Sequence, residues 1–195
     1  MRLLITGGSG HLGSELVRLA GEHQLIATYH RAPPTAVSGV AWRSLDVRRR
    51  TEVTALIRDV RPEAVIHTAF RQTDWATTAD GAAHVAVAAE AVGAHLVHVS
   101  SDAVFSGRNS PYDEAAAPDP VTPYGAAKAA AETAVRAIAP GALIARTSLI
   151  IGGGRSSSES LSCTSLPTAS GRACCSPTTF VALCTYPTWL QRCWS

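Results

Sequence analysis

Short apolar runs alternate with segments of helical periodicity along the first 150 residues of this chain. A short apolar run between turn residues is typical of a buried strand, whereas apolar residues three and four positions apart are typical of a helix that packs on one side. The runs that predict strands are residues 2–6, 24–29, 42–47 and 64–69, and a further strand ends at 98–102. Helices are predicted from residue 12 to 20, where Leu12, Leu16 and Leu19 share one face, and over residues 49–60. This alternation predicts an α/β fold with a parallel, doubly wound sheet.

A glycine-rich segment joins the first predicted strand to the first predicted helix. It reads Gly7-Gly8-Ser9-Gly10-His11-Leu12-Gly13. Glycines at positions 7, 10 and 13 let the backbone turn tightly, approach a pyrophosphate and pack the helix closely on the sheet, and the amino end of the helix faces the phosphates. The alternative is a tight strand-to-helix turn that binds no ligand. We interpret residues 1–152 as a Rossmann-type NAD(P)-binding domain.

The second predicted strand ends at Tyr29, close to where such a domain binds the adenosine ribose. NAD-selective proteins usually place a carboxylate there, but this chain has His30 and Arg31. A guanidinium can pair with a 2′-phosphate, so Arg31 predicts NADP(H) as the preferred cofactor, with NAD(H) as the alternative. Arg31 could also be a solvated loop residue. The third predicted strand ends with Asp46 and Val47, and the carboxylate of Asp46 could accept a hydrogen bond from the adenine amino group.

Lys128 is the only lysine of the chain, which otherwise uses sixteen arginines, and it stands four residues after Tyr124. Side chains at positions i and i+4 of a helix lie one above the other, so the phenol and the ammonium can point into one site. A nearby positive charge favours the phenolate and brings a tyrosine closer to the range of acid and base catalysis. The spacing therefore predicts a proton donor beside a cation. A chance pair on a surface helix is the alternative.

Composition and charge narrow the possible partners. Hydrophobic residues make up 46% of the chain and charged residues 16%, with a net charge of +2, which is typical of a soluble globular protein. No basic run indicates nucleic acid, and no apolar stretch reaches the about 18 residues that a membrane span needs. Residues 1–20 read as a glycine-interrupted strand and helix rather than a signal peptide, so we expect a cytoplasmic protein without a nucleic-acid or membrane partner. His67, His95 and His98 lack the spacing of a metal site, so we expect satisfied core or edge histidines and no metal.

Three motifs, in this order along the chain, resemble those of the extended short-chain dehydrogenase/reductase family. They are the glycines at 7, 10 and 13, the strand ending His98-Val99-Ser100-Ser101-Asp102, and the pair Tyr124-x-x-x-Lys128. Three segments resemble the dTDP-4-dehydrorhamnose reductase branch of this family: Val99-Ser100-Ser101-Asp102-Ala103-Val104-Phe105-Ser106-Gly107, Pro111-Tyr112-Asp113-Glu114 and Pro120-Val121-Thr122-Pro123-Tyr124-Gly125. The resemblance covers residues 1 to about 155.

The resemblance implies an NADP(H)-dependent reductase that acts on a keto-sugar nucleotide, a small-molecule substrate. By this resemblance Ser101 would hydrogen-bond the substrate carbonyl, and Tyr124 would give the proton as hydride arrives from the nicotinamide. Lys128 would hold the nicotinamide ribose and favour the phenolate. Thr68-Ala69 would line the cofactor, and the backbone of Gly10-His11-Leu12 would bind the pyrophosphate.

Two departures from the branch bear on the sugar rather than on the reductase chemistry. The chain has Ser106 where the branch usually has an acidic residue, and Leu149 where a tryptophan is common. Two other functions also stay open. One is an NAD-dependent sugar-nucleotide epimerase or dehydratase, for which Asp102 is the only candidate for the further acid or base, and the other is a non-catalytic NADP-binding regulator. A homodimer is a further open alternative.

The composition changes abruptly after Arg155. All five cysteines lie beyond residue 160, and neither hydrophobic period continues there. When residues 173–195 are back-translated and read in another frame, plausible codons yield Arg-Cys-Pro-Val-His-Val-Pro-Asp-Leu-Ala, which resembles the C-terminal region of the family. A metal-binding or disulfide-bonded tail is the alternative. We therefore interpret residues 153–195 as an aberrant, frameshifted tail, and the substrate domain as truncated or missing.

Overall fold

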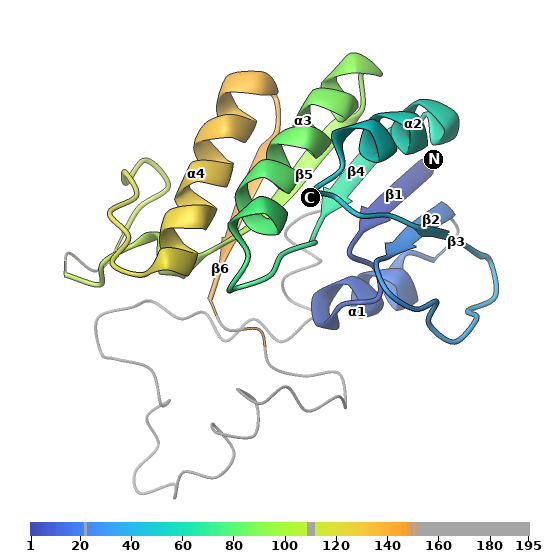
Figure 1. The fold of residues 1–195 in the computed structure, drawn as a ribbon, viewed down its shortest axis with the longest axis horizontal. Helices are drawn as coiled ribbons and strands as arrows, with labels where there is room; N and C mark the ends of the chain where they lie inside the picture. Colours follow the sequence, from blue (N-terminus) through green and yellow to red (C-terminus); the bar gives the residue numbers. More distant parts are fainter. Residues whose placement is uncertain (22, 109–111, 149, 151–195) are drawn as a thin grey trace, which may run out of the picture.

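Six strands form one parallel sheet in a computed structural model of the chain, which describes residues 1–21, 23–108, 112–148 and 150 (Figure 1). The strands are β1 (Arg2–Thr6), β2 (Gln24–Tyr29), β3 (Val40–Ser44), β4 (Ala64–His67), β5 (His95–Ser101) and β6 (Leu143–Thr147). Their order in the sheet is β3-β2-β1-β4-β5-β6. The chain thus winds outward from β1 in one direction and returns to wind outward in the other, which confirms the predicted doubly wound sheet.

Helices cover both faces of this sheet. The helices are α1 (His11–Leu19), α2 (Arg50–Val60), α3 (Gly81–Ala91) and α4 (Pro123–Ile138), with a π-helical turn η1 (Ala76–Asp80) before α3 and a 3₁₀ turn η2 (Asp102–Val104) after β5. Figure 1 shows α2, α3 and α4 side by side over one face, with α1 apart from them. Among the described residues, no helix is long and apolar enough to span a membrane.

Each face of the sheet builds its own apolar core. Alternate residues of a strand point to opposite faces. Leu4 of β1 therefore packs with residues of α2, α3 and α4, such as Val53 and Val85, while its neighbour Leu3 packs with Leu16 of α1. Strands buried on both faces explain the continuous apolar runs in the sequence.

Two strands end earlier than the sequence predicts. The strand predicted at 42–47 spans Val40–Ser44, because the Arg48 amide donates to the side chain of Asp46 (3.1 Å) and the chain turns there. The strand predicted at 64–69 ends at His67, although the Thr68 amide still donates to the Thr6 carbonyl of β1 (3.0 Å). Both corrections place predicted site residues in the turns beyond the strands. The predicted tail at 153–195 lies outside the described residues.

The first turn of α4 packs closely on η2. Thr122 caps the helix by accepting a hydrogen bond from the Gly125 amide (3.0 Å), and Pro123 takes the first helical position. A Cβ atom at position 125 would overlap the backbone carbonyl oxygen of Ala103. Only glycine therefore lets the start of α4 approach the segment that follows β5 this closely.

We predict that Gly125→Ala destabilises the fold by about 1–3 kcal/mol, because the added methyl group must push α4 away from η2. Helix propensity alone predicts the opposite sign, a gain of about 1 kcal/mol. Gly141→Ala is the matched control, since an added Cβ at position 141 meets nothing within 4 Å. Urea unfolding of the three proteins measures the difference, and equal stability of the two variants would contradict the packing argument.

Candidate active site

One cavity of about 1110 Å³ runs along the carboxyl ends of the strands, where parallel α/β sheets bind ligands. Every residue that the sequence predicts as a site residue lines it, although these residues come from six different parts of the chain. They are Gly7, Gly10, His11, Leu12, Gly13, His30, Arg31, Asp46, Val47, Thr68, Ala69, Ser101, Tyr124 and Lys128. The volume suits a ligand of dinucleotide size.

The glycine-rich turn forms one wall of this cavity without room for side chains. Gly7 has a φ of 75°, and a Cβ there would lie 2.7 Å from the backbone nitrogen of Ala69. A Cβ at Gly13 would overlap the carbonyl oxygen of Gly7. The N-cap residue of α1, Gly10, makes no side-chain cap hydrogen bond, and the positive end of the helix dipole favours an anion there. This wall fits a pyrophosphate.

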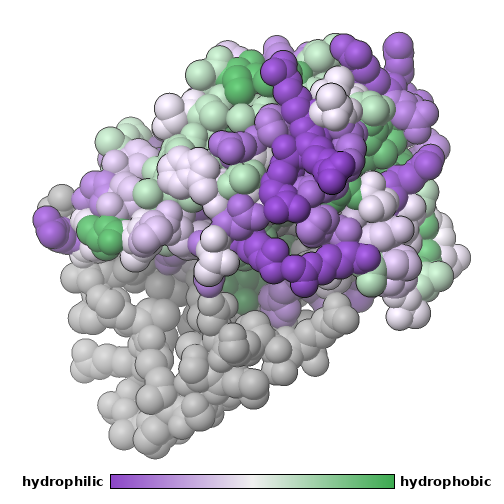
Figure 2. Space-filling model, viewed as in Figure 1, coloured by the Kyte–Doolittle hydropathy of each residue, from purple (hydrophilic) through white to green (hydrophobic). Residues whose placement is uncertain are grey.

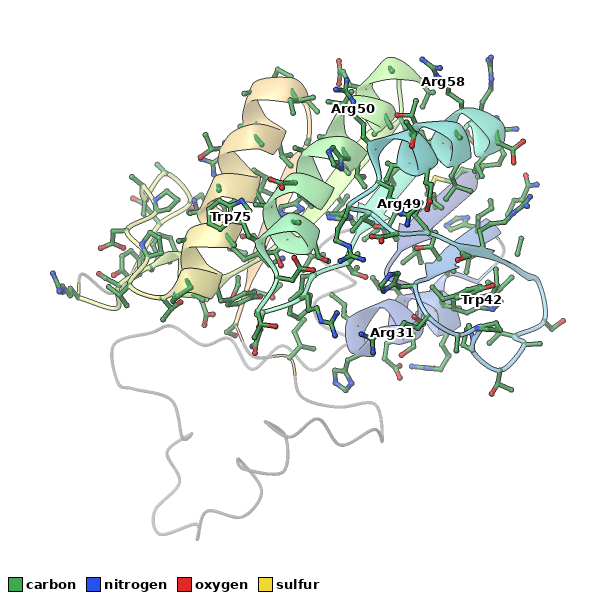
Figure 3. The ribbon with its side chains drawn as sticks, in the orientation of Figure 1. Arg31, Trp42, Arg49, Arg50, Arg58 and Trp75 are labelled. Atoms are coloured by element: carbon green, nitrogen blue, oxygen red, sulfur yellow. The ribbon has the colours of Figure 1, made fainter. Side chains whose placement is uncertain are left out.

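Basic side chains gather where the adenosine ribose is expected. Arg31 is exposed, and no carboxylate in the described part of the chain pairs with it; Figure 3 shows it beside α1. The carboxylate of Asp46 accepts hydrogen bonds from Arg48 (2.7 Å), which lower the pKa of Asp46 to about 2. His30 Nε2 lies 3.6 Å from the same carboxylate. Asp46, the carboxylate that lines this end of the cavity in the described part of the chain, is thus already paired, and Arg31 makes no ion pair with a described carboxylate.

The strongly hydrophilic side chains of Figure 2 gather nearby, on the face of α2. Arg49, Arg50 and Arg58 lie there in Figure 3. Arg49 pairs with Glu52 (3.3 Å), and none of the three lines the cavity. These arginines are therefore distinct from Arg31, which is predicted to bind the 2′-phosphate of the adenosine ribose.

Tyr124, Lys128 and Ser101 meet at the other end of the cavity. Tyr124 and Lys128 lie one turn apart on α4, and Ser101 is the last residue of β5. The Nζ atom of Lys128 donates to the backbone carbonyl of Val99 (2.9 Å). The Oγ atom of Ser101 donates to Asp102 Oδ1 (3.2 Å). A phenol, an ammonium and a hydroxyl thus line this corner of the cavity.

The ammonium of Lys128 is almost fully buried, with 3% of the residue exposed. Burial disfavours its charged form and lowers the pKa of Lys128 from 10.5 to about 8, although the carboxylate of Glu132 opposes this. The lysine therefore remains mostly charged at pH 7 but loses its proton far more readily than an exposed lysine.

A buried carboxylate holds α4 against the sheet one turn after Lys128. Glu132 accepts a hydrogen bond from Ser100 Oγ of β5 (2.6 Å) and three charge-assisted bonds from Arg146 of β6, the shortest at 2.7 Å. Arg146 also donates to the carbonyl of Ala116 (3.1 Å). Such a network fixes geometry at a desolvation cost. It locks the register of α4, and with it the position of Tyr124 and Lys128.

Asp102 is the only acidic side chain beside this corner that lines the cavity. Burial raises its pKa, while the hydrogen bond from Ser101 acts in the opposite direction. A carboxyl with a raised pKa in a cavity is suited to acid and base chemistry. The structure thus keeps Asp102 available to the epimerase and dehydratase alternatives.

The expectation of satisfied core or edge histidines is confirmed in part: His67 and His98 do lie in the core, but most of their ring nitrogens are not satisfied within the described protein. His67 and His98 occupy paired positions on β4 and β5, and their buried rings stack with centroids 5.4 Å apart. His67 Nδ1 lies 2.6 Å from Thr6 Oγ1, but the other three ring nitrogens have no hydrogen-bond partner within the described protein. Burial lowers the pKa of both residues well below the usual value, to about 3 for His67, so both are neutral. No three potential metal ligands cluster among the described residues.

Sequence reasoning missed several side chains of the cavity. Thr28 at the end of β2 accepts a hydrogen bond from the Gly7 amide (3.1 Å) and so positions the glycine turn. Phe70 and Arg71 follow β4, and Thr147 ends β6. All four stand at the carboxyl end of a parallel strand, and that position was the signal that could have found them.

Ser106 stands where the branch usually has an acidic residue, but a carboxylate from another segment, that of Asp119, contacts it. Asp119 accepts hydrogen bonds from the Ser106 amide (2.8 Å) and from its hydroxyl. These bonds lower the pKa of Asp119. A carboxylate is therefore present beside position 106, although the residue at this position is not acidic.

The sequence is similar to known proteins over most of the described part. It matches the family model of the RmlD substrate binding domain over residues 1–161. It is 35% identical over 172 residues to methionine adenosyltransferase 2 subunit beta of Xenopus tropicalis, covering 82% of this chain and 50% of that protein. It is 36% identical over 164 residues to a probable dTDP-4,6-dihydroxy-2-methyloxan-3-one 4-ketoreductase of Streptomyces antibioticus, covering 78% of this chain and 52% of that protein. The chain spans about half the length of these curated relatives.

Solved structures with the same fold bind NADP or NAD. One is dTDP-4-dehydrorhamnose reductase of Bacillus anthracis str. Ames in complex with NADP, with a TM-score of 0.65 and 31% identity over 77% of this chain and 54% of that chain. Another is the Bordetella bronchiseptica enzyme WbmG in complex with NAD and UDP, with a TM-score of 0.64 and 26% identity over 76% of this chain and 52% of that chain.

We predict that Lys128 titrates near pH 8 in the folded protein. Because it is the only lysine, growth with lysine labelled with ¹³C at the ε carbon gives one side-chain NMR signal that needs no assignment. Its midpoint should lie near 8, as burial requires, and move to about 10.4 when the same protein is unfolded in urea. A folded midpoint equal to the unfolded one would show that the ammonium is not buried.

Proposed function

The chain belongs to the RmlD substrate binding domain family, and from this premise we propose that it is an NADP(H)-dependent reductase of a keto-sugar nucleotide, of the dTDP-4-dehydrorhamnose reductase kind. One observation carries the proposal. A single cavity joins the glycine wall, which fits a pyrophosphate, to the corner of Tyr124, Lys128 and Ser101. A cofactor bound along the glycine wall would therefore reach the proton donor.

The proposed reaction divides between the cofactor and this corner. The reduced nicotinamide, when bound, supplies a hydride to the carbonyl carbon. Ser101 hydrogen-bonds the carbonyl oxygen and Tyr124 gives it the phenolic proton, so that the carbonyl becomes an alcohol. The ammonium of Lys128 favours the phenolate that remains and binds the ribose hydroxyls. Glu132 and Arg146 keep these groups in register by anchoring α4 to β5 and β6.

The preference for NADP(H) rests on Arg31. It lines the cavity beyond β2, and the nearest carboxylate of the cavity, Asp46, is paired with Arg48. A 2′-phosphate would give Arg31 a bidentate partner, whereas a 2′-hydroxyl would find no free carboxylate at this place.

A second candidate function is a cofactor-binding regulator without turnover. Its support is the similarity to methionine adenosyltransferase 2 subunit beta, a protein named as a subunit. The glycine wall and Arg31 would serve this function as well as the first. Tight binding of NADPH without reduction of any keto-sugar nucleotide would favour the regulator.

We predict that the protein binds NADPH about tenfold or more tightly than NADH, because a charge-assisted pair with the 2′-phosphate contributes roughly 1.5–3 kcal/mol. Arg31→Ala should remove this preference by weakening NADPH binding alone. Arg58→Ala, which removes an arginine of α2 outside the cavity, should change neither affinity. Fluorescence titration of the three proteins with both nucleotides gives six affinities, and equal affinities for NADPH and NADH in the unaltered chain would show that Arg31 does not bind the 2′-phosphate.

We predict that Tyr124→Phe lowers turnover by roughly 10² or more, with cofactor binding nearly unchanged, because it removes only the proton donor. The assay is NADPH oxidation with a keto-sugar nucleotide, and the protein is the chain restored to the alternative frame, after sequencing the DNA around codons 152 to 160. Tyr112→Phe is the control, a tyrosine outside the cavity. Turnover of Tyr124→Phe close to that of the control would refute the acid assignment.

A further inference from the structure

Phe70 is a large apolar side chain in an unusual place. It is 51% exposed, and of the exposed large hydrophobic residues in the described part of the chain it alone lines the cavity. An exposed phenylalanine inside a functional cavity indicates a contact that the fold itself does not need.

The backbone fixes the position of Phe70 from both sides. Ala69, the preceding residue, lies against Gly7 so closely that only glycine fits there. Thr78 of η1 accepts a hydrogen bond from the amide of Arg71, the following residue (3.0 Å), and donates one to its carbonyl (2.8 Å). Phe70 is therefore held between two anchored residues at the carboxyl end of β4.

The ring of Phe70 contacts both members of the predicted catalytic pair. The Nζ atom of Lys128 lies 5.1 Å from the ring centroid. The ring of Tyr124 lies 5.8 Å away, centroid to centroid, at an angle of 44°. A cation over an aromatic face and a tilted pair of rings are both attractive arrangements. Phe70 thus bridges two side chains that stand one turn apart on α4.

We propose that Phe70 is a positioning residue for this pair, which holds the ammonium of Lys128 by its aromatic face and shields it from water. The proposal rests on the proposed function, since the pair is catalytic only in a reductase. The contact with the aromatic face and the exclusion of water shift the pKa of Lys128 in opposite directions. The aromatic face stabilises the charged form, whereas exclusion of water destabilises it.

The other titratable groups around Lys128 do not interfere with a test. Glu132 faces it from α4, and the two neutral histidines, His67 and His98, lie on β4 and β5. Tyr124 lies one turn earlier on the same helix. Of these groups only Tyr124 contacts the ring of Phe70, so a change in the titration of Lys128 reports the loss of the ring together with its contact to Tyr124.

The test titrates the single ¹³C-labelled lysine in the full chain, without cofactor. Phe70→Leu keeps an apolar cover but removes the aromatic face, so the midpoint should fall by about half a unit to one unit. Phe70→Ala also admits water, so its midpoint should lie above that of Phe70→Leu. Phe70→Tyr should restore the value of the unaltered chain. Trp75→Leu is the matched control, because Trp75 is 52% exposed, lies near α4 in Figure 3 and does not line the cavity.

Each outcome decides the proposal. A midpoint of Phe70→Leu equal to that of Trp75→Leu, or higher, would overturn the role of the aromatic face. A midpoint of Phe70→Ala at or below that of Phe70→Leu would overturn the shielding. An NADPH titration adds a second measure, in which Phe70→Leu should bind about threefold to tenfold more weakly than Trp75→Leu. If the unaltered chain bound no nucleotide, the proposed function would fail while the lysine titration would still decide the role of Phe70.

Discussion

The close packing of α4 on the end of β5 is the constraint on which the corner of Tyr124, Lys128 and Ser101 depends. Gly125 allows the helix to approach η2, and Glu132 binds Ser100 and Arg146 two turns further along. These two anchors, one apolar and one ionic, fix both the distance and the rotation of the helix. Tyr124 and Lys128 lie between or beside them, so their place in the cavity is set by packing that involves no ligand. The site is preorganised in this sense.

This preorganisation costs stability at Lys128. A folded pKa of about 8 against an unfolded value near ~10.4 means that the buried charge destabilises the fold by about 3 kcal/mol. The sign follows from proton binding. Between pH 8 and about 10.4 the unfolded chain holds the proton that the folded chain has released, so stability rises with pH there, and the full cost applies below pH 8. An arginine could not lose its proton in this way, which gives a physical reason for one lysine among sixteen arginines.

The features that the sequence predicted correctly were either local in the chain or followed from one rule, that the carboxyl ends of parallel strands lie at the same edge of the sheet. Apolar runs located the strands, and glycines marked the cavity wall, because each signal lies within a few residues. The early end of β3 depends on the hydrogen bond that the Asp46 side chain accepts from the Arg48 amide. The stacking of His67 on His98, and the carboxylate that Asp119 supplies to Ser106, join residues far apart in the chain. No spacing in the sequence encodes such contacts.

The two candidate functions make different demands on this fold. A regulator that only binds NADP needs the glycine wall and a cation for the 2′-phosphate, both of which lie away from α4. The ammonium of Lys128, and the ring of Phe70 that contacts it, would also help a regulator to bind the cofactor, but a regulator gains nothing from the phenol of Tyr124 beside that ammonium. Such an arrangement is useful where a proton must leave the phenol and the resulting charge must be stabilised. The phenol of Tyr124 beside the buried ammonium is therefore a feature that a reductase uses and a regulator does not, and the two candidate functions differ at Tyr124 rather than at the cofactor end of the cavity.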